Sequence, residues 1–117
     1  NIFFWYYDCF SSCRVLNFDN ISCFPLSLDA ISDEVGIELK KQSKFLMDDL
    51  RANAEVKTRN YSNFGSVEIL TFYARKSKHI MNKIDELLGY HYRLSKHEIN
   101  YLSNYAADFR SDDAEDE

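Results

Sequence analysis

The sequence is poor in the residues that build phosphate-binding loops. Its three glycines, Gly36, Gly65 and Gly89, stand alone, and Pro25 is the only proline among 117 residues. A loop that cradles a phosphate or a nucleotide cofactor needs closely spaced glycines, because its backbone must approach the ligand. The sequence therefore excludes a glycine-rich nucleotide-binding loop.

Long apolar runs are also absent. The longest lies at the N-terminus, is about nine residues long and is interrupted by Asp8, whereas a membrane-spanning helix needs about 20 residues. The run lacks the basic flank and the small-residue cleavage site of a signal peptide. We therefore expect a cytoplasmic chain without a membrane partner. The chain begins inside this run without a methionine, which we interpret as the boundary of a fragment cut from a larger protein.

Residue patterns for metal binding and catalysis are missing as well. Cys9, Cys13 and Cys23 are odd in number and lack the spacing of a zinc site, so we expect small buried thiols in a reducing compartment. The three histidines lack a serine or cysteine at a spacing that suggests a relay. We interpret the acidic pairs at 48–49 and 85–86 as solvated helix faces. The sequence thus predicts no catalytic residue and no metal ligand.

The negative charge is concentrated at the C-terminus. The net charge is −5, and five carboxylates lie within the last seven residues, so the remaining chain is neutral. No apolar residue larger than Ala114 can anchor this end, which predicts a disordered acidic tail over residues 111–117. On the neutral body, the only dense basic cluster comprises Arg75, Lys76, Lys78 and His79.

The first half of the chain predicts two helices. Residues 2–15 are apolar or aromatic on every face, which predicts a buried helix, although the aromatic content would also suit a strand. Residues 18–27 predict an extended connection ended by Pro25. The apolar periodicity that follows predicts an amphipathic helix over residues 29–53, whose start Ser27 or Asp29 can cap.

The second half predicts two more helices. Residues 54–73 indicate a loop with a short extended stretch. Ser77 can cap a third helix that ends at Gly89, and Ser95 with Glu98 forms a capping-box pattern before a last helix that reaches Phe109. The last two helices should form a hairpin. We therefore predict a mainly α fold of about four helices with a short extended or loop connection, over residues 1–110.

Two stretches carry a family resemblance. In the first, an aromatic run leads to a Cys-Arg step, a Leu-Asn step and a Phe-Pro before a long helix. In the second, a Tyr-Ala-Arg-Lys-Ser-Lys run precedes a helix containing Ile-Asp, then a His-Tyr step and a final helix. The matching residues are Phe3 to Tyr7, Cys13, Arg14, Leu16, Asn17, Phe24 and Pro25 in the first stretch, and Tyr73, Arg75 to Lys78, Ile84, Asp85, His91, Tyr92, Glu98, Ile99, Asn104 and Tyr105 in the second.

These stretches cover about half of the chain. In order and spacing they resemble the C-terminal region of adenine-specific N6 DNA methyltransferases, the large enzymes of type II and IIG restriction-modification and related phage-defence systems. The chain departs from the family pattern at Ala74 and His79, where proline is frequent, and at Ser12, where an acidic residue is common.

The resemblance implies a role in an enzyme whose chemistry lies elsewhere. The parent enzyme would transfer a methyl group from S-adenosylmethionine to the amine of a flipped adenine. Its catalytic Asn-Pro-Pro-Tyr motif and its cofactor motif would lie upstream, so this fragment would hold no cofactor and would not be catalytic. Its implied partners are double-stranded DNA and the upstream methyltransferase domain of the same parent chain.

The residues expected to contact DNA fall into three groups. Arg75, Lys76 and Lys78 are candidates for phosphate contacts, with Ser77 at a helix N-terminus. Arg14 and Asn17 can read base edges, although such a pair is as often a local hydrogen-bonding device. The third group, in the predicted loop, comprises Lys57 and Arg59.

A different function suits the same composition. An aromatic N-terminal segment, an acidic tail and several helices would also suit a protein-interaction or subunit-docking module without nucleic acid contact. An exposed aromatic segment would promote self-association of the isolated chain.

Overall fold

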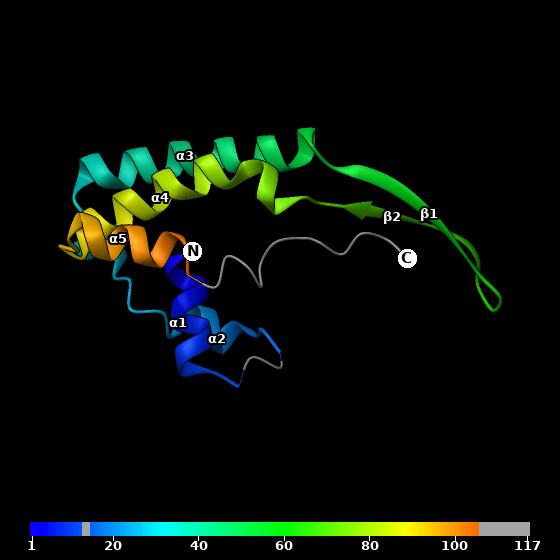
Figure 1. The fold of residues 1–117 in the computed structure, drawn as a ribbon, viewed down its shortest axis with the longest axis horizontal. Coiled ribbons are helices and arrows are strands. Elements are labelled where there is room, and N and C mark those ends of the chain that lie inside the picture. The colour runs from blue at the N-terminus through cyan, green and yellow to red at the C-terminus, as the bar shows by residue number, and fades with distance from the viewer. Residues whose placement is uncertain (13–14, 106–117) are drawn as a thin grey trace.

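The computed structural model describes residues 1–12 and 15–105, and this part of the chain is mainly helical, as predicted (Figure 1). Arg14, Cys13, the last residues of the predicted final helix and the acidic tail lie outside the described residues. The elements, in chain order, are α1 (Ile2–Phe10), α2 (Phe18–Ser22), the 3-10 helix η1 (Leu28–Ala30), α3 (Asp33–Ala52), β1 (Glu55–Tyr61), β2 (Gly65–Thr71), the 3-10 helix η2 (Ala74–Ser77), α4 (Lys78–His91) and α5 (Lys96–Ser103).

Helices α3, α4 and α5 form the body of the molecule together with the start of α1. Figure 1 shows α3 and α4 lying side by side and antiparallel, with α5 folded back along α4 and the start of α1 near α5. Ile2, Val35, Ile80 and Leu102, each from a different helix, are buried between them. The predicted hairpin of the last two helices is confirmed, and so is the capping box of Ser95.

The start of α3 differs from the prediction. Residues 28–30 form the separate helix η1, and Ile31 then adopts an extended backbone (φ −75°, ψ 132°), so neither Ser27 nor Asp29 can cap α3. Ser32 is the cap instead, because its hydroxyl accepts a hydrogen bond from the amide of Val35 at 3.4 Å.

Residues 18–27 are not the extended connection that we predicted. Asn17 and Asn20 cap the short helix α2 reciprocally: each side-chain oxygen accepts a hydrogen bond from the backbone amide of the other residue, at 3.0 Å and 3.1 Å. The two amides that a helix start leaves unpaired are thus satisfied locally, which stabilises a helical turn here.

The N-terminal aromatic segment is less buried than predicted. Helix α1 ends at Phe10, which is 70% exposed, and only Ile2 of this helix is buried. Cys9 and Cys23 are exposed, so the prediction of buried thiols is wrong for both. The rings of α1 pack mainly against each other and against Phe24, whose centroid lies 5.4 Å from that of Phe3. A single helix with no polar face cannot be covered on all sides by so small a body.

Residues 55–71 form a β-hairpin in place of the predicted loop with a short strand. The strands pair antiparallel from Glu55 opposite Thr71 to Tyr61 opposite Gly65. The amide of Phe64 donates to the carbonyl of Tyr61 at 3.3 Å, and Gly65 takes a positive φ of 75°. A three-residue loop closed by a left-handed glycine is a common hairpin connection. Figure 1 shows that the hairpin extends away from the helices.

Within residues 1–12 and 15–105, no helix has the length and apolar character needed to cross a membrane.

Candidate nucleic-acid interface

Tyr73 gathers two basic residues from different elements at the base of the hairpin. The ammonium nitrogen of Lys57, on β1, lies 5.8 Å from the centroid of the Tyr73 ring, and that of Lys76, on η2, lies 4.8 Å from it. The Tyr73 hydroxyl donates to a carboxylate oxygen of Glu55 at 2.9 Å, which orients the ring. Lysines 19 positions apart in the sequence therefore share one aromatic platform.

The pairing of the strands places Arg59 on the same face of the hairpin as Lys57. Directly paired residues share a face and successive residues alternate, so the face with Lys57 also carries Arg59 and Val67. Glu68 pairs with Thr58 and lies on the opposite face. Beyond Glu55, this hairpin face thus has two cations and no carboxylate.

We call Lys57, Arg59, Arg75 and Lys76 the basic strip. Arg59, Arg75 and Lys76 are exposed, and Lys57 is half-buried. The sequence placed Lys57 and Arg59 in a separate loop; the structure brings Lys57 and Lys76 together through Tyr73, a residue that sequence reasoning left without a role.

The side chain of Ser77 faces the interior, while its prediction as a source of backbone donors stays a prediction. Its side chain is fully buried, and its hydroxyl donates to Asp49 Oδ2 at 2.6 Å. It makes no side-chain cap to α4, contrary to the prediction. Asp49, which we expected on a solvated face, instead joins α3 to the start of α4. We therefore leave Ser77 out of the basic strip.

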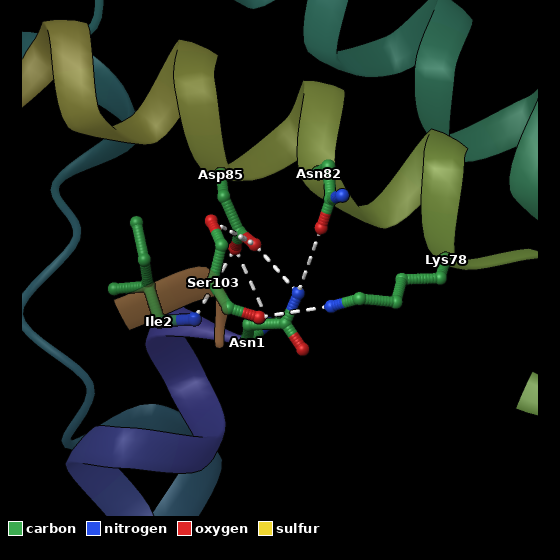
Figure 2. A network of polar contacts seen from close by, with 6 residues as sticks. All are labelled: Asn1, Ile2, Lys78, Asn82, Asp85 and Ser103. Atoms are coloured by element: carbon green, nitrogen blue, oxygen red, sulfur yellow. Dashed lines mark hydrogen bonds and ion pairs between the residues drawn. The ribbon is translucent and has the colours of Figure 1, made fainter. Parts of the chain in front are cut away.

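Lys78 is also turned inward. Its ammonium group donates to the backbone carbonyl of Ser103 at 3.0 Å (Figure 2). Because this carbonyl lies at the end of α5, where helix carbonyls lack partners, the ammonium acts as a C-terminal cap of α5. Lys78 therefore joins the start of α4 to the end of α5, and we leave it out of the basic strip.

Asp85 is the centre of a buried polar network that the sequence did not reveal. Only 1% of Asp85 is exposed. Its Oδ1 accepts from the Ile2 amide at 3.2 Å and lies at the same distance from the backbone nitrogen of Asn1. Its Oδ2 accepts from the Asn1 side chain at 2.7 Å and from the Ser103 hydroxyl at 3.3 Å (Figure 2).

The solvated face predicted for residues 85–86 is therefore wrong at Asp85. Its carboxylate lies at the N-terminus of α1, where the helix dipole favours a negative charge. It links α1, α4 and α5, and through Ser103 it reaches Lys78.

Asn17 serves the local role that we left open. Its side chain is engaged in the reciprocal cap of α2 described above. The fold therefore gives Asn17 a structural task, and its prediction as a base-reading residue stays a prediction.

A hydrogen bond also perturbs Tyr105. Its hydroxyl lies 2.6 Å from Asp8 Oδ2, and this hydrogen bond to the carboxylate raises the pKa of Tyr105 from 10.0 to about 12. Asp8 of α1 is thereby joined to the residue that follows α5. Among the residues that the structure describes, no three His, Cys, Asp or Glu side chains are grouped so that they could hold a metal ion.

Comparison of the chain with protein-family models, with curated proteins and with solved structures finds no match. The function must therefore be argued from the residues of this chain.

Proposed function

We propose that this chain is a duplex-DNA-binding, non-catalytic part of a site-specific adenine-N6 DNA methyltransferase of a restriction-modification system. The observation that carries the proposal is the basic strip, which runs from η2 onto one face of a projecting hairpin. The methyl donor S-adenosylmethionine and the catalytic motif would belong to the upstream domain of the same cytoplasmic enzyme.

The shape of the hairpin suits a DNA groove. A strand of seven residues is roughly 20 Å long, and two paired strands are narrow enough to enter a major groove. With one face toward the duplex, Lys57 and Arg59 reach phosphates along the groove, and Arg75 and Lys76 reach them at its edge. Contacts of this kind position a protein on the duplex and leave base reading to other residues.

The local charge favours DNA although the whole chain is acidic. Between residues 55 and 78, only Glu55 and Glu68 oppose five lysines and arginines, which are Lys57, Arg59, Arg75, Lys76 and Lys78. A concentrated positive region attracts phosphates even when the net charge of the protein is negative, because screening confines charge interactions to about 10 Å.

The test is the salt dependence of duplex-DNA binding by the whole chain. If the four residues of the strip contact phosphates, the affinity should fall roughly 100-fold between 50 and 200 mM salt, because each contact releases counterions. The R59A/K76A double variant should lose about half of the slope of log affinity against log salt.

The matched control is K40A/K44A, which removes two exposed positive charges from α3. It should leave the slope nearly unchanged. Absence of binding at 50 mM salt, or an equal loss of slope in the control, would contradict the proposal.

One observation favours a second candidate, a protein-docking module without DNA contact. The hairpin also exposes large apolar side chains, including Phe64 at its tip, which is 83% exposed, and the paired residues Val56 and Leu70 on the face opposite the basic strip. Apolar docking depends weakly on salt, so a partner interaction that survives 200 mM salt and is lost in a V56S/L70S variant would favour this candidate.

A further inference from the structure

An apolar groove lies between α1 and α5, on a part of the molecule separate from the hairpin. Its volume is about 480 Å³, which is within the range of small-molecule sites. Its lining includes Trp5 and Tyr6 of α1 and Tyr101 of α5, together with Phe24 and Tyr92.

The burial of the lining residues separates a floor from a rim. Ile2 and Leu102 are buried and form an aliphatic floor, whereas Glu98 and Tyr101 are exposed and stand at the rim. The imidazole of His97 is exposed as well, whereas Trp5, Tyr6, Phe24 and Tyr92 are half-buried. A ligand that fills this groove therefore meets apolar surface at its inner end and polar groups only at its outer end.

Two tyrosines, Tyr6 and Tyr92, present ring surface to the groove while their hydroxyls bind backbone carbonyls. The Tyr6 hydroxyl donates to the carbonyl of Cys23 at 3.0 Å, and the Tyr92 hydroxyl donates to the carbonyl of Pro25 at 2.7 Å. Both rings also make edge contacts with Phe24, at centroid distances of 5.3 Å and 6.4 Å. The wall is thus held in place before any ligand arrives.

The electrostatics of the groove favour a ligand with a positive charge. Among the described residues that line it, Glu98 carries a negative charge, none is a lysine or arginine, and His97 is the one histidine. An anion would meet a carboxylate and the negative faces of the rings, whereas a cation is attracted by both.

We propose that this groove binds a small organic cation, with the apolar part of the ligand on the Ile2–Leu102 floor and its ammonium or guanidinium group between Tyr101 and Glu98. This site is independent of DNA binding. It requires no residue of the basic strip, so either proposal can fail without the other.

Trp5 makes the proposal directly measurable, because it is the only tryptophan of the chain and it lines the groove. Its fluorescence can be titrated in the full chain at pH 8 with phenyltrimethylammonium and with tert-butylbenzene, which has the same shape without the charge. We expect a saturable change with both ligands and about tenfold tighter binding of the cation. Equal affinities would overturn the assignment of a cation, and the absence of a saturable change with either ligand would overturn the site.

Two variants test the named rim residues. E98Q removes the charge and preserves the capping box with Ser95, because glutamine also serves at that position. We expect several-fold weaker binding of the cation and unchanged binding of the neutral ligand. Y101L removes an aromatic face at a residue that is 60% exposed, and it should weaken cation binding similarly.

The matched control is E68Q, which removes the same charge from the distant hairpin. An equal effect of E68Q and E98Q on cation binding would overturn the role of Glu98. A normal affinity of Y101L for the cation would overturn the placement of the cation beside that ring.

Discussion

Asp85 and Ser77 show that residues with polar side chains hold the helices of this protein together. Asp85 accepts hydrogen bonds from Asn1, Ile2 and Ser103, and Ser77 donates to Asp49. These contacts satisfy buried polar groups that would otherwise destabilise the fold. Because the buried apolar residues are few, we expect such contacts to contribute a substantial part of the stability.

The first prediction concerns Asp85. Replacing Asp85 with alanine removes the acceptor of the Ile2 amide and of the Asn1 side chain and leaves both donors buried. We expect the free energy of unfolding to fall by about 3 kcal/mol, measured by urea denaturation. E86A removes the adjacent, exposed carboxylate and should change the free energy of unfolding by less than about 0.5 kcal/mol. Similar effects of the two variants would contradict the buried network.

At the scale of the element, α4 and α5 approach each other closely at Gly89. A Cβ atom at this position would lie 2.5 Å from Cγ1 of Ile99, which is well inside van der Waals contact. The prediction that α4 ends at Gly89 is wrong, because the helix continues to His91. Gly89 lies inside the helix, where the absence of a side chain leaves room for Ile99. Gly36 in α3 differs, since an added Cβ would meet only Ile31 Cγ2 at 3.8 Å.

The second prediction compares these two glycines. G89A should destabilise the protein by about 1–3 kcal/mol through overpacking against Ile99. G36A should stabilise it by about 0.5–1 kcal/mol, because alanine is the better helix former and no side chain must move.

Urea denaturation of both variants checks the comparison. The double variant G89A/I99A should be more stable than the sum of the two single changes implies, since the clash is removed. Strict additivity would contradict the close approach of α4 and α5.

At the scale of the whole molecule, a helical body carries a hairpin that extends away from it (Figure 1). The strands pair with each other, and their outer residues on both faces are exposed. The body therefore has little need of the hairpin for its own packing, which is the expected arrangement for an element with a binding role.

The third prediction tests this division. Glu55 and Thr71 are directly paired, so an Asn-Gly turn can replace residues 56–70 and still connect these two residues at their present separation. We expect the shortened chain to keep its helical circular dichroism and to unfold within a few degrees of the parent. It should lose about half of the slope of log DNA affinity against log salt, because Lys57 and Arg59 are removed while Arg75 and Lys76 remain. Loss of helical signal would show that the hairpin supports the body, and unchanged DNA binding would remove the hairpin from the interface.

The sequence by itself determined the features that depend on near neighbours. The capping box of Ser95 and Glu98 requires only residues three positions apart, and the amphipathic pattern of α3 requires only a helical period, so both predictions were confirmed. The mainly helical class follows from the same local signals. Local signals failed at the start of α3, where Ser27 or Asp29 was predicted as the cap and Ser32 is the cap. They also failed where asparagines capped a short helix inside an apparent loop.

Only the tertiary structure decided which polar residues are buried and which cations meet. The sequence predicts a solvated pair at 85–86, whereas packing of α1 and α5 buries Asp85. Lys57 and Lys76 lie near each other because both contact the ring of Tyr73, which follows the second strand of the hairpin. The aromatic groove likewise combines residues from both ends of the chain. The physical reason is that burial and charge proximity are properties of surfaces brought together by packing, whereas a single sequence records only the order of residues along the chain.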